Sequence, residues 1–296
     1  MPELPEVETV RRGLAEWIVG RTIKKLEMVH KGGNRSSTYF PVHAVNGAKV
    51  RNLHRRGKFL WFEINRDYAL VAHLGMSGQF IIQDKSAPDE KHLRARIDCG
   101  DRRKEVRFND QRTFGWIAID PLVPDDMRLI PASFQRIAHD IFDPEFDLDW
   151  VISRIKRKKS AIKRVLLDQK LMSGVGNIYA DEALWQAKIH PERSADKLSE
   201  KEIKSILASV KKVMTSALKQ GGTSFDDLYI NVNGESGYFD VALKAYGREG
   251  EPCTRCGSDI RRITFGNRSS HYCSRCQLNK GQSKIRSKKV GSKRGK

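Results

Sequence analysis

Apolar residues recur at helical spacing near the start of the chain. The residues that set this spacing are Val7, Val10, Leu14, Trp17 and Ile18. Residues three or four positions apart share one face of a helix, so the pattern predicts an amphipathic helix over residues 7–19. Gly20 follows it and is expected to end it.

From Thr22 to Asp120 the pattern changes to short runs in which apolar and polar residues alternate. Glycines and charged turns separate the runs, which is typical of antiparallel strands in a sandwich or barrel. The strands are predicted over residues 23–29, 48–53, 59–64, 69–73, 79–82, 93–99, 106–108 and 114–119. We therefore expect residues 1–130 to form one helix plus a β domain.

The second part of the chain follows a helical pattern. Residues 121–150 are rich in Pro and Asp without a clear period, and we expect the linker between domains here, over 131–150. Helices are predicted over residues 151–168, 177–186, 199–220 and 224–228. Ser199 and Glu202 match a capping box. The expected parts are a helical domain over 151–249, a cysteine module over 250–280 and a tail over 281–296.

The balance of charged residues indicates which class of binding partner the protein favours. Lys and Arg number 55 against 36 Asp and Glu, a formal net charge of +19. This excess indicates a polyanion, most simply nucleic acid, although ribosomal association or an acidic membrane surface would also fit. No apolar run reaches the ~20 residues that cross a bilayer, so we expect a soluble, cytoplasmic protein. The tail is basic without an acid, cannot bury a core, and is expected to be disordered.

Four of the five cysteines form two Cys-x-x-Cys pairs. Cys253 and Cys256 precede Cys273 and Cys276, with sixteen residues between the pairs. Four thiolates at this spacing fit one tetrahedral Zn²⁺ ion, and the filled coordination sphere makes it structural and not catalytic. Cys99 stands alone in a strand-like run and is predicted to be a small buried hydrophobe.

The segment between the cysteine pairs predicts a β-hairpin. Residues 260–272 begin with alternation and contain Gly266-Asn267 as a turn. Arg268 follows this turn, where it could reach a phosphate. A solvated arginine is the alternative.

The first eight residues, Met1-Pro2-Glu3-Leu4-Pro5-Glu6-Val7-Glu8, suit covalent chemistry. Removal of Met1 would expose the secondary amine of Pro2. Such an amine titrates near pH ~8, so a fraction is an uncharged nucleophile at neutral pH. Glu3 is one residue away and could move protons. The alternative is that Pro2 and Pro5 only shape the start of a helix.

A second candidate segment runs from Ser160 to Tyr179. Gly174 and Gly176 precede Asn177, which we expect to cap the next helix. Glycines before a helix expose backbone N–H groups to an anion, for example a nucleic-acid phosphate, with Lys163 nearby. An ordinary helix hairpin is the alternative.

Three turns carry further candidates. Lys58 lies in Arg55-Arg56-Gly57-Lys58-Phe59, Met76 lies between glycines in His73–Gly78, and Arg112 and Phe114 lie in Asp110–Gly115. Exposed hairpin residues or a surface pair would explain each turn by itself. By themselves, these turns show only a flexible apolar side chain, a cation and a flat ring on plausible turns.

Together these motifs, from Pro2 to Cys276, resemble the formamidopyrimidine-DNA glycosylases. Tyr238-Phe239 and Tyr246-Gly247-Arg248 fit the same pattern. The resemblance implies an α+β multidomain fold: an N-terminal helix with an antiparallel β-sandwich, then a helix–two-turn–helix domain with a zinc β-hairpin. It also implies a monomer that acts on damaged double-stranded DNA.

The resemblance also implies a role for each candidate. Pro2 would form a Schiff base, with Glu3, Lys58 and Arg268 as further catalytic residues and Glu6 in support. The DNA-binding residues would be Met76, Arg112, Phe114, Lys163, Asn177 and Tyr246. The implied activity is excision of oxidised purines and strand cleavage at the resulting abasic site, with a loop over 224–238 closing over the extruded base.

Two departures and two other functions stay open. Residues 138–144 replace the family's usual Leu-Gly-containing linker, and the basic tail is an extension that the family does not require. An endonuclease VIII-like enzyme for oxidised pyrimidines would share Pro2 and the zinc site. A non-catalytic zinc-containing nucleic-acid-binding protein would explain the charge but leaves Pro2-Glu3 without a purpose.

Overall fold

The computed structural model describes residues 2–29, 41–65, 67–125, 128–221, 232 and 243–279. The chain divides into two compact units. The first comprises residues 1–140 and 215–241, and the second comprises residues 141–214 and 242–296. Across the described ranges, no helix has both the length and the apolar character that a membrane span requires.

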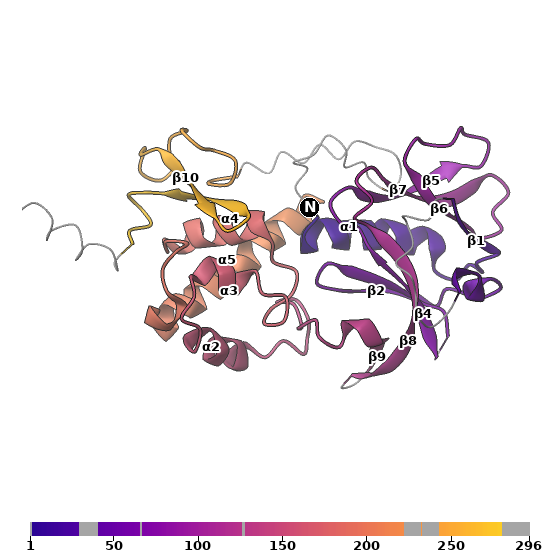
Figure 1. The fold of residues 1–296 in the computed structure, drawn as a ribbon, viewed down its shortest axis with the longest axis horizontal. Helices are drawn as coiled ribbons and strands as arrows, with labels where there is room; N and C mark the ends of the chain where they lie inside the picture. Colours follow the sequence, from indigo (N-terminus) through magenta and orange to yellow (C-terminus); the bar gives the residue numbers. More distant parts are fainter. Residues whose placement is uncertain are drawn as a thin grey trace, which may run out of the picture. The chain divides into compact units, whose positions relative to one another are not determined.

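The first unit begins with α1 (Leu4–Ile18) and continues as two antiparallel sheets (Figure 1). The five-stranded sheet has the order β2 (Asn52–Arg56), β3 (Phe59–Glu63), β4 (Tyr68–His73), β8 (Trp116–Asp125) and β9 (Arg128–Pro131). The four-stranded sheet has the order β1 (Lys25–Met28), β6 (Leu93–Asp98), β7 (Lys104–Asp110) and β5 (Gly78–Asp84). Short 3₁₀ helices occur at Val42–Val45 (η2) and Ala132–Phe134 (η3).

One hydrophobic core joins α1 to both sheets. Leu14 of α1, Phe62 and Ile117 of the five-stranded sheet, and Phe80 and Phe108 of the four-stranded sheet are all buried in it. Each such side chain contributes about 1.5–3 kcal/mol when it leaves water. The predicted helix and antiparallel strands are confirmed, and the helix begins at Leu4, earlier than its apolar spacing indicated.

The strand pattern continues beyond the predicted end at Ile119. β8 runs on to Asp125 and pairs with β9, in a region that showed no clear period. The prolines there obscured the strands because Pro cannot donate to a ladder. Pro131 lies on the edge strand β9, opposite Leu122, where a missing donor is tolerated.

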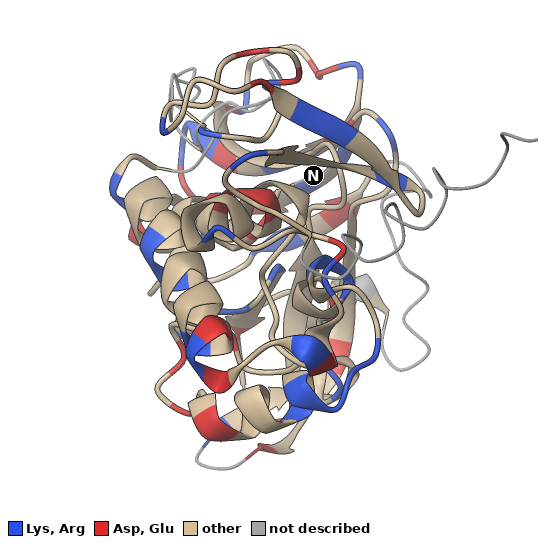
Figure 2. Ribbon diagram, turned by 90° about the vertical axis from the view of Figure 1, so that its left-hand side faces the viewer, with Lys and Arg blue, Asp and Glu red and all other residues tan. Residues whose placement is uncertain are grey.

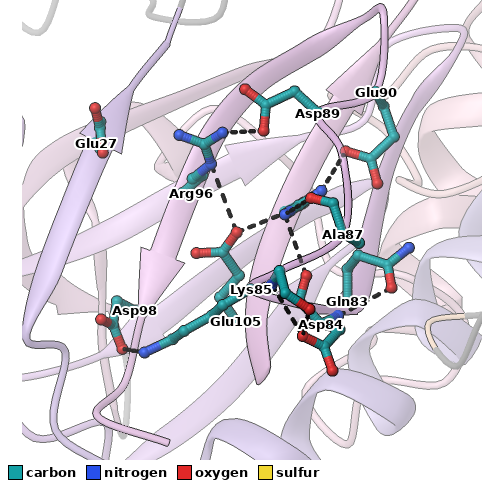
Figure 3. A network of polar contacts seen from close by, with 12 residues as sticks. Glu27, Gln83, Asp84, Lys85, Ala87, Asp89, Glu90, Arg96, Asp98 and Glu105 are labelled. Atoms are coloured by element: carbon teal, nitrogen blue, oxygen red, sulfur yellow. Dashed lines mark hydrogen bonds and ion pairs between the residues drawn. The ribbon is translucent and has the colours of Figure 1, made fainter. Parts of the chain in front are cut away.

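A polar network covers one region of the four-stranded sheet (Figure 3). Arg107 of β7 is 1% exposed and donates to Glu105 at 2.8 Å and to Glu90 at 3.2 Å. It also donates to the backbone carbonyls of Asp84, Ala87 and Pro88. One buried guanidinium therefore fixes the loop between β5 and β6.

The second unit contains α2 (Leu148–Lys156), α3 (Ile162–Leu166), α4 (Asn177–Ala187) and most of α5 (Glu200–Lys219). A 3₁₀ helix, η4, spans Ala195–Lys197. The hairpin of β10 (Ile260–Phe265) and β11 (Arg268–Cys273) packs against α4. The predicted capping box is confirmed: the Ser199 N–H donates to Glu202 at 2.9 Å, and the Glu202 N–H donates to the Ser199 hydroxyl at 3.3 Å.

The single helix predicted over residues 151–168 is wrong. α2 ends at Lys156, and α3 begins at Ile162. Arg157, Lys158 and Lys159 extend a run of like charge that disfavours further helix. Ala161 then forms a bridge with Ser194 and so leaves the helical path.

Candidate active site and nucleic-acid interface

The N-terminal candidates lie together at the start of α1. Pro2, Glu3 and Glu6 are all buried, Glu3 and Glu6 to 2% and 4% exposure. A carboxylate oxygen of Glu6 accepts a hydrogen bond from the backbone N–H of Glu3 at 2.8 Å. Glu6 therefore fixes the backbone one residue from Pro2, and Pro5 in the first turn stiffens the same segment.

Charged groups tie α1 to the turn that carries Lys58. Arg55 donates to Glu8 of α1 at 3.1 Å, to the Gly57 carbonyl at 3.0 Å and to Asp140 at 2.7 Å. Asp140 also accepts from the Gly57 N–H at 3.1 Å. Gly57 has a positive φ of 56°, which glycine adopts without strain. The Lys58 side chain, 5% exposed, is thereby held at a fixed turn.

Glu8 is the ionised centre of this connection. Burial raises the pKa of its carboxyl group, but hydrogen bonds from Arg11 and Arg12 and the charges of Arg55 and Arg11 outweigh burial and lower the pKa to about 2. The Glu8 carboxylate therefore stays charged across the neutral range and continues to hold Arg55.

Met76, Arg112 and Phe114 project from two neighbouring turns of the first unit. Met76 is 40% exposed and Phe114 is 59% exposed, which is unusual for large apolar side chains, and Arg112 is also exposed. The turns touch through their backbones: a Cβ added at Gly75 would lie 2.4 Å from the Phe114 carbonyl carbon. Only glycine fits there, so the turns are held in contact.

In the second unit, Lys163 is enclosed. Its side chain is 0% exposed, and its Nζ pairs with Asp181 at 2.7 Å and donates to the Ser269 carbonyl at 2.9 Å. Asp181 also accepts from the Ser270 hydroxyl and the His271 N–H, each at 2.8 Å. Lys163 thus links α3 and α4 to β11, and a direct phosphate contact would require this ion pair to open.

Asn177 is the first residue of α4, and Gly176 is the N-cap, so the prediction that Asn177 caps this helix is wrong. The extended backbone of Gly176 ends the loop without a side-chain cap. The Asn177 side-chain oxygen is buried and has no hydrogen-bond partner among the described residues. Gln169 closes the preceding loop, accepting from the Gly174 N–H and donating to the Val175 carbonyl.

Tyr246 lies on a loop held by one buried carboxylate. Glu182 of α4, 5% exposed, accepts from the N–H groups of Lys244, Ala245 and Tyr246 at 2.8–3.1 Å. The Tyr246 ring meets His271 edge-on, with centroids 5.0 Å apart. Tyr246 is therefore tied both to α4 and to the hairpin.

Arg268 is exposed at the start of β11, directly after the turn at Gly266-Asn267. Gly266 has a φ of 61° and allows the tight turn. The predicted hairpin is confirmed, with Phe265 opposite Arg268. Figure 2 shows basic residues on helices and strands alike, so no single element carries the charge.

The four cysteines of the pairs converge on one point. The sulfur atoms of Cys253, Cys256, Cys273 and Cys276 all lie within 4.8 Å of one another. Backbone N–H groups point at the sulfurs; a hydrogen bond from the Ser258 N–H is the largest influence on the Cys256 thiol and lowers its pKa to about 6. Four cysteine sulfurs gathered at this distance fit one structural Zn²⁺ ion.

Other predictions have separate outcomes. Cys99 is 6% exposed, and burial raises the pKa of its thiol to about 12, so it is an unreactive buried residue as predicted. The expected loop over 224–238, the helix at 224–228, Tyr238-Phe239 and the tail over 281–296 lie outside the described residues.

Sequence reasoning missed the carboxylates that position these groups, namely Asp140, Asp181 and Glu182. Each is buried, at 2%, 0% and 5% exposure. The local sequence carries no signal for them, because a buried carboxylate is recognised by its several donors, and these come from other segments. Their partners are 62 to 90 residues distant in the chain and could not be assigned.

Models of three domains match the chain. Residues 1–117 match the formamidopyrimidine-DNA glycosylase N-terminal domain, residues 137–228 match the formamidopyrimidine-DNA glycosylase H2TH domain, and residues 250–279 match a zinc finger found in FPG and IleRS.

Whole-chain relatives and solved structures agree. The chain is 50% identical to a formamidopyrimidine-DNA glycosylase of a Nocardioides species over 282 residues, 94% of each chain. It is 51% identical to that of Rhodococcus opacus, covering 94% of this chain and 97% of the relative. A variant of the Lactococcus lactis FPG in complex with Fapy-dG containing DNA is similar at a TM-score of 0.82 and 33% identity, over 94% of this chain and 100% of that one. The complex of the Lactococcus lactis enzyme with an abasic site containing DNA has a TM-score of 0.80 and 33% identity, over 93% and 99%. The α+β fold, the order of domains and the cysteine cluster with its single structural zinc place this chain in the formamidopyrimidine-DNA glycosylase family.

Proposed function

We propose that this protein is a monomeric, cytoplasmic base-excision-repair enzyme that removes oxidised purines from duplex DNA and then cleaves the strand. The observation that carries the proposal is the arrangement of Pro2, Glu3 and Glu6 at the start of α1. Family membership and the damaged-DNA complexes of the Lactococcus lactis relative support it.

The proposed chemistry starts at the Pro2 nitrogen once Met1 is removed. The uncharged secondary amine attacks C1′ of the damaged nucleotide, the bond from C1′ to the base breaks, and the base leaves with the electron pair. After the amine loses its proton, the C1′–O4′ bond breaks and O4′ takes its electron pair and a proton. The nitrogen lone pair then forms the C1′=N bond, so the opened sugar stays attached to Pro2 as a Schiff base (iminium). Glu3, fixed through Glu6, transfers protons at the sugar ring.

Strand cleavage follows by two eliminations. The Schiff base makes the C2′ proton acidic, so the 3′ phosphate leaves first and the 5′ phosphate leaves in the second step. Lys58 and Arg268 are the proposed groups at these phosphates, each on a fixed turn. The result is a one-nucleotide gap. Zn²⁺ supplies structure to the hairpin that carries Arg268.

DNA contacts come from both units in this proposal. Met76, Arg112 and Phe114 fill the gap and separate bases on extrusion, whereas Asn177 and Tyr246 meet the backbone. Backbone contacts add affinity and orientation but do not select the lesion. Lys163 does not contact DNA directly in this proposal; its ion pair with Asp181 supports the hairpin that carries Arg268.

Borohydride trapping tests the proposal directly. Wild-type protein is mixed with a duplex that carries 8-oxoguanine opposite cytosine, and the reduced covalent adduct is measured. Pro2→Gly, which replaces the secondary amine with a more mobile primary one, should abolish the adduct, whereas Pro5→Ala, which alters the same segment and keeps the secondary amine, should retain it. Mass spectrometry of the protein establishes whether Pro2 is the mature N-terminus. An undiminished adduct with Pro2→Gly would refute the proposed nucleophile.

The same assay separates the alternatives. A duplex with thymine glycol replaces the 8-oxoguanine duplex; faster excision of thymine glycol would favour an enzyme for oxidised pyrimidines. A crystal structure of the Lactococcus lactis FPG with oxidized pyrimidine containing DNA makes this comparison pertinent. Failure of wild-type protein to form any adduct would favour the non-catalytic binding protein.

A further inference from the structure

The exposed set Met76, Arg112 and Phe114 has a common support. The three side chains project from two separate turns, and short turns with exposed apolar tips would move if nothing held them. Asp110, the last residue of β7, lies behind both turns and is 0% exposed.

The Asp110 carboxylate binds donors from both turns. One oxygen accepts from the Ser77 hydroxyl at 2.5 Å and from the Arg112 N–H at 3.2 Å. The other oxygen accepts from the Gly115 N–H at 2.6 Å. The Ser77 oxygen in turn accepts from the Arg112 N–H at 2.9 Å, which closes the connection between the turns.

The backbone of Asp110 is fixed from the opposite side. Its N–H donates to the His92 carbonyl at 2.9 Å, and its carbonyl accepts from Arg94 at 2.9 Å. In the β5–β7 pairing, Asp110 lies opposite Gly78. Arg107, in the same strand, is also buried and donates to Glu105 and Glu90, so β7 is bonded to its surroundings at both Arg107 and Asp110.

The space around the carboxylate is full. A Cβ added at Gly115 would lie 2.8 Å from the Phe108 ring and 3.1 Å from an Asp110 oxygen. A Cβ added at Gly78 would lie 2.4 Å from the Leu74 carbonyl oxygen. A side chain at either glycine would therefore displace the backbone or ring packed around Asp110.

We propose that Asp110 is a positioning residue that holds Met76, Arg112 and Phe114 as one preorganised wedge. The inference rests on the proposed glycosylase function. If the turns were loose, DNA binding would have to order them while it also unstacks the lesion, and base extrusion would slow. A carboxylate is required because both of its oxygens must accept; an amide offers only one acceptor oxygen.

Asp110→Asn tests this, with Asp120→Asn as the matched control. Asp120 is also a buried acid of the first unit, 6% exposed, and accepts from the Ser133 N–H at 2.9 Å, away from both turns. Two reactions are compared: single-turnover excision from an 8-oxoguanine duplex, and borohydride trapping on a duplex with a preformed abasic site. The second reaction requires no base to be released.

We expect Asp110→Asn to slow excision by about 10- to 100-fold, the scale of small misplacements of reacting groups, and to change trapping at the preformed abasic site far less. 2-Aminopurine beside the lesion should show a matching loss of unstacking. Asp120→Asn should leave both reactions near the wild-type rates. Ser77→Ala removes one donor and keeps the acid, and it should also lower the rate of excision. This second variant tests the proposal if Asp110→Asn fails to fold.

Two results would overturn the inference: excision by Asp110→Asn or Ser77→Ala at the wild-type rate, or an equal fall in excision and trapping. In both cases adduct formation by the wild-type protein leaves the proposed function intact. Absence of any wild-type adduct would instead defeat the proposed function, and the role of Asp110 with it.

Discussion

The turns that present Arg112 and Arg268 are held by different means. Arg112 projects from a large sheet, and one carboxylate, Asp110, collects the hydrogen bonds that fix its turn. Arg268 projects from a two-stranded hairpin with few buried side chains of its own, and the cysteine cluster and the Lys163–Asp181 pair hold it. A two-stranded hairpin with a small core is stabilised further by metal ligation and an ion pair, whereas a turn on a packed sheet requires only local hydrogen bonds.

Of the predicted changes, loss of zinc should have the largest effect. The structural change should be confined to the hairpin. We expect Cys253→Ser to lower zinc content well below one ion per chain and to weaken binding to damaged duplex at least tenfold, because structural zinc contributes about 10–16 kcal/mol of apparent binding free energy to such modules. Metal analysis and a DNA titration measure both. Cys99→Ser, a change at the buried cysteine outside the cluster, should keep zinc and affinity. Zinc-free protein that binds normally would contradict the assigned role.

Breaking the buried ion pair should come next. Lys163→Met leaves Asp181 charged and buried at 0% exposure, so we expect a loss of about 3–5 kcal/mol in the free energy of unfolding. The double variant Lys163→Met/Asp181→Asn should be less destabilised than Lys163→Met, because no unpaired charge remains. Denaturant unfolding measures both. If Lys163→Met were as stable as the wild type, the Lys163–Asp181 pair would not stabilise the hairpin.

Acid pH should lower the free energy of unfolding of the first unit by protonating Glu8. The folded-state pKa of about 2 lies below the ordinary value of 4.5, so ionised Glu8 stabilises the fold above pH 4.5, and this contribution is lost as the pH falls from 4.5 towards 2. Glu8→Gln should cost about 1.5–3 kcal/mol near neutral pH, the scale of charged hydrogen bonds, and nothing near pH 2. Unfolding from pH 7 to pH 2 tests this, with Glu16→Gln, an exposed acid of the same helix, as the control. A gap between Glu8→Gln and wild type that persists at the lowest pH would be inconsistent with this assignment.

The sequence predicted those features of the fold that depend on residues close together in the chain. Alternation located most strands, spacing located α1, α4 and α5, and the two Cys-x-x-Cys pairs located the metal cluster. The cap of α4 was assigned to Asn177 because an Asn before a helix usually caps it, but the extended backbone of Gly176 already ends the loop.

The groups that fix the candidate site could not be predicted, for a common reason. Asp140 meets Gly57 across 83 residues, and Asp181 meets His271 across 90. Nothing in the periodicity of either segment identifies such a partner, since each acid reads locally as a surface residue. Only the fold shows that these acids are buried and which N–H groups they accept from.

The smallest expected effect compares backbone strain in the two regions. Thr113, in the Arg112 turn, and Lys188, which caps α4, have φ values of 55° and 59°; they are the only non-glycine residues with positive φ in the described part of the chain. This conformation costs an L-residue about 1–2 kcal/mol, and glycine relieves it at some cost in chain entropy. Lys188→Gly should therefore raise the free energy of unfolding by about 0.5–1 kcal/mol, as at helix ends generally. Thr113→Gly should raise the free energy of unfolding by less, because this variant also loses the hydrogen bond from the Thr113 hydroxyl to the Arg112 carbonyl at 2.7 Å.

Excision by the same two variants sharpens the comparison further. If Asp110 alone fixes the turn, Thr113→Gly should leave excision within about twofold of wild type, since none of the Asp110 hydrogen bonds involves Thr113. Single-turnover excision from the 8-oxoguanine duplex measures this, with Lys188→Gly as the control in the second unit. A large loss of excision in Thr113→Gly, with Lys188→Gly unaffected, would show that the strained Thr113 backbone shares the positioning role proposed for Asp110.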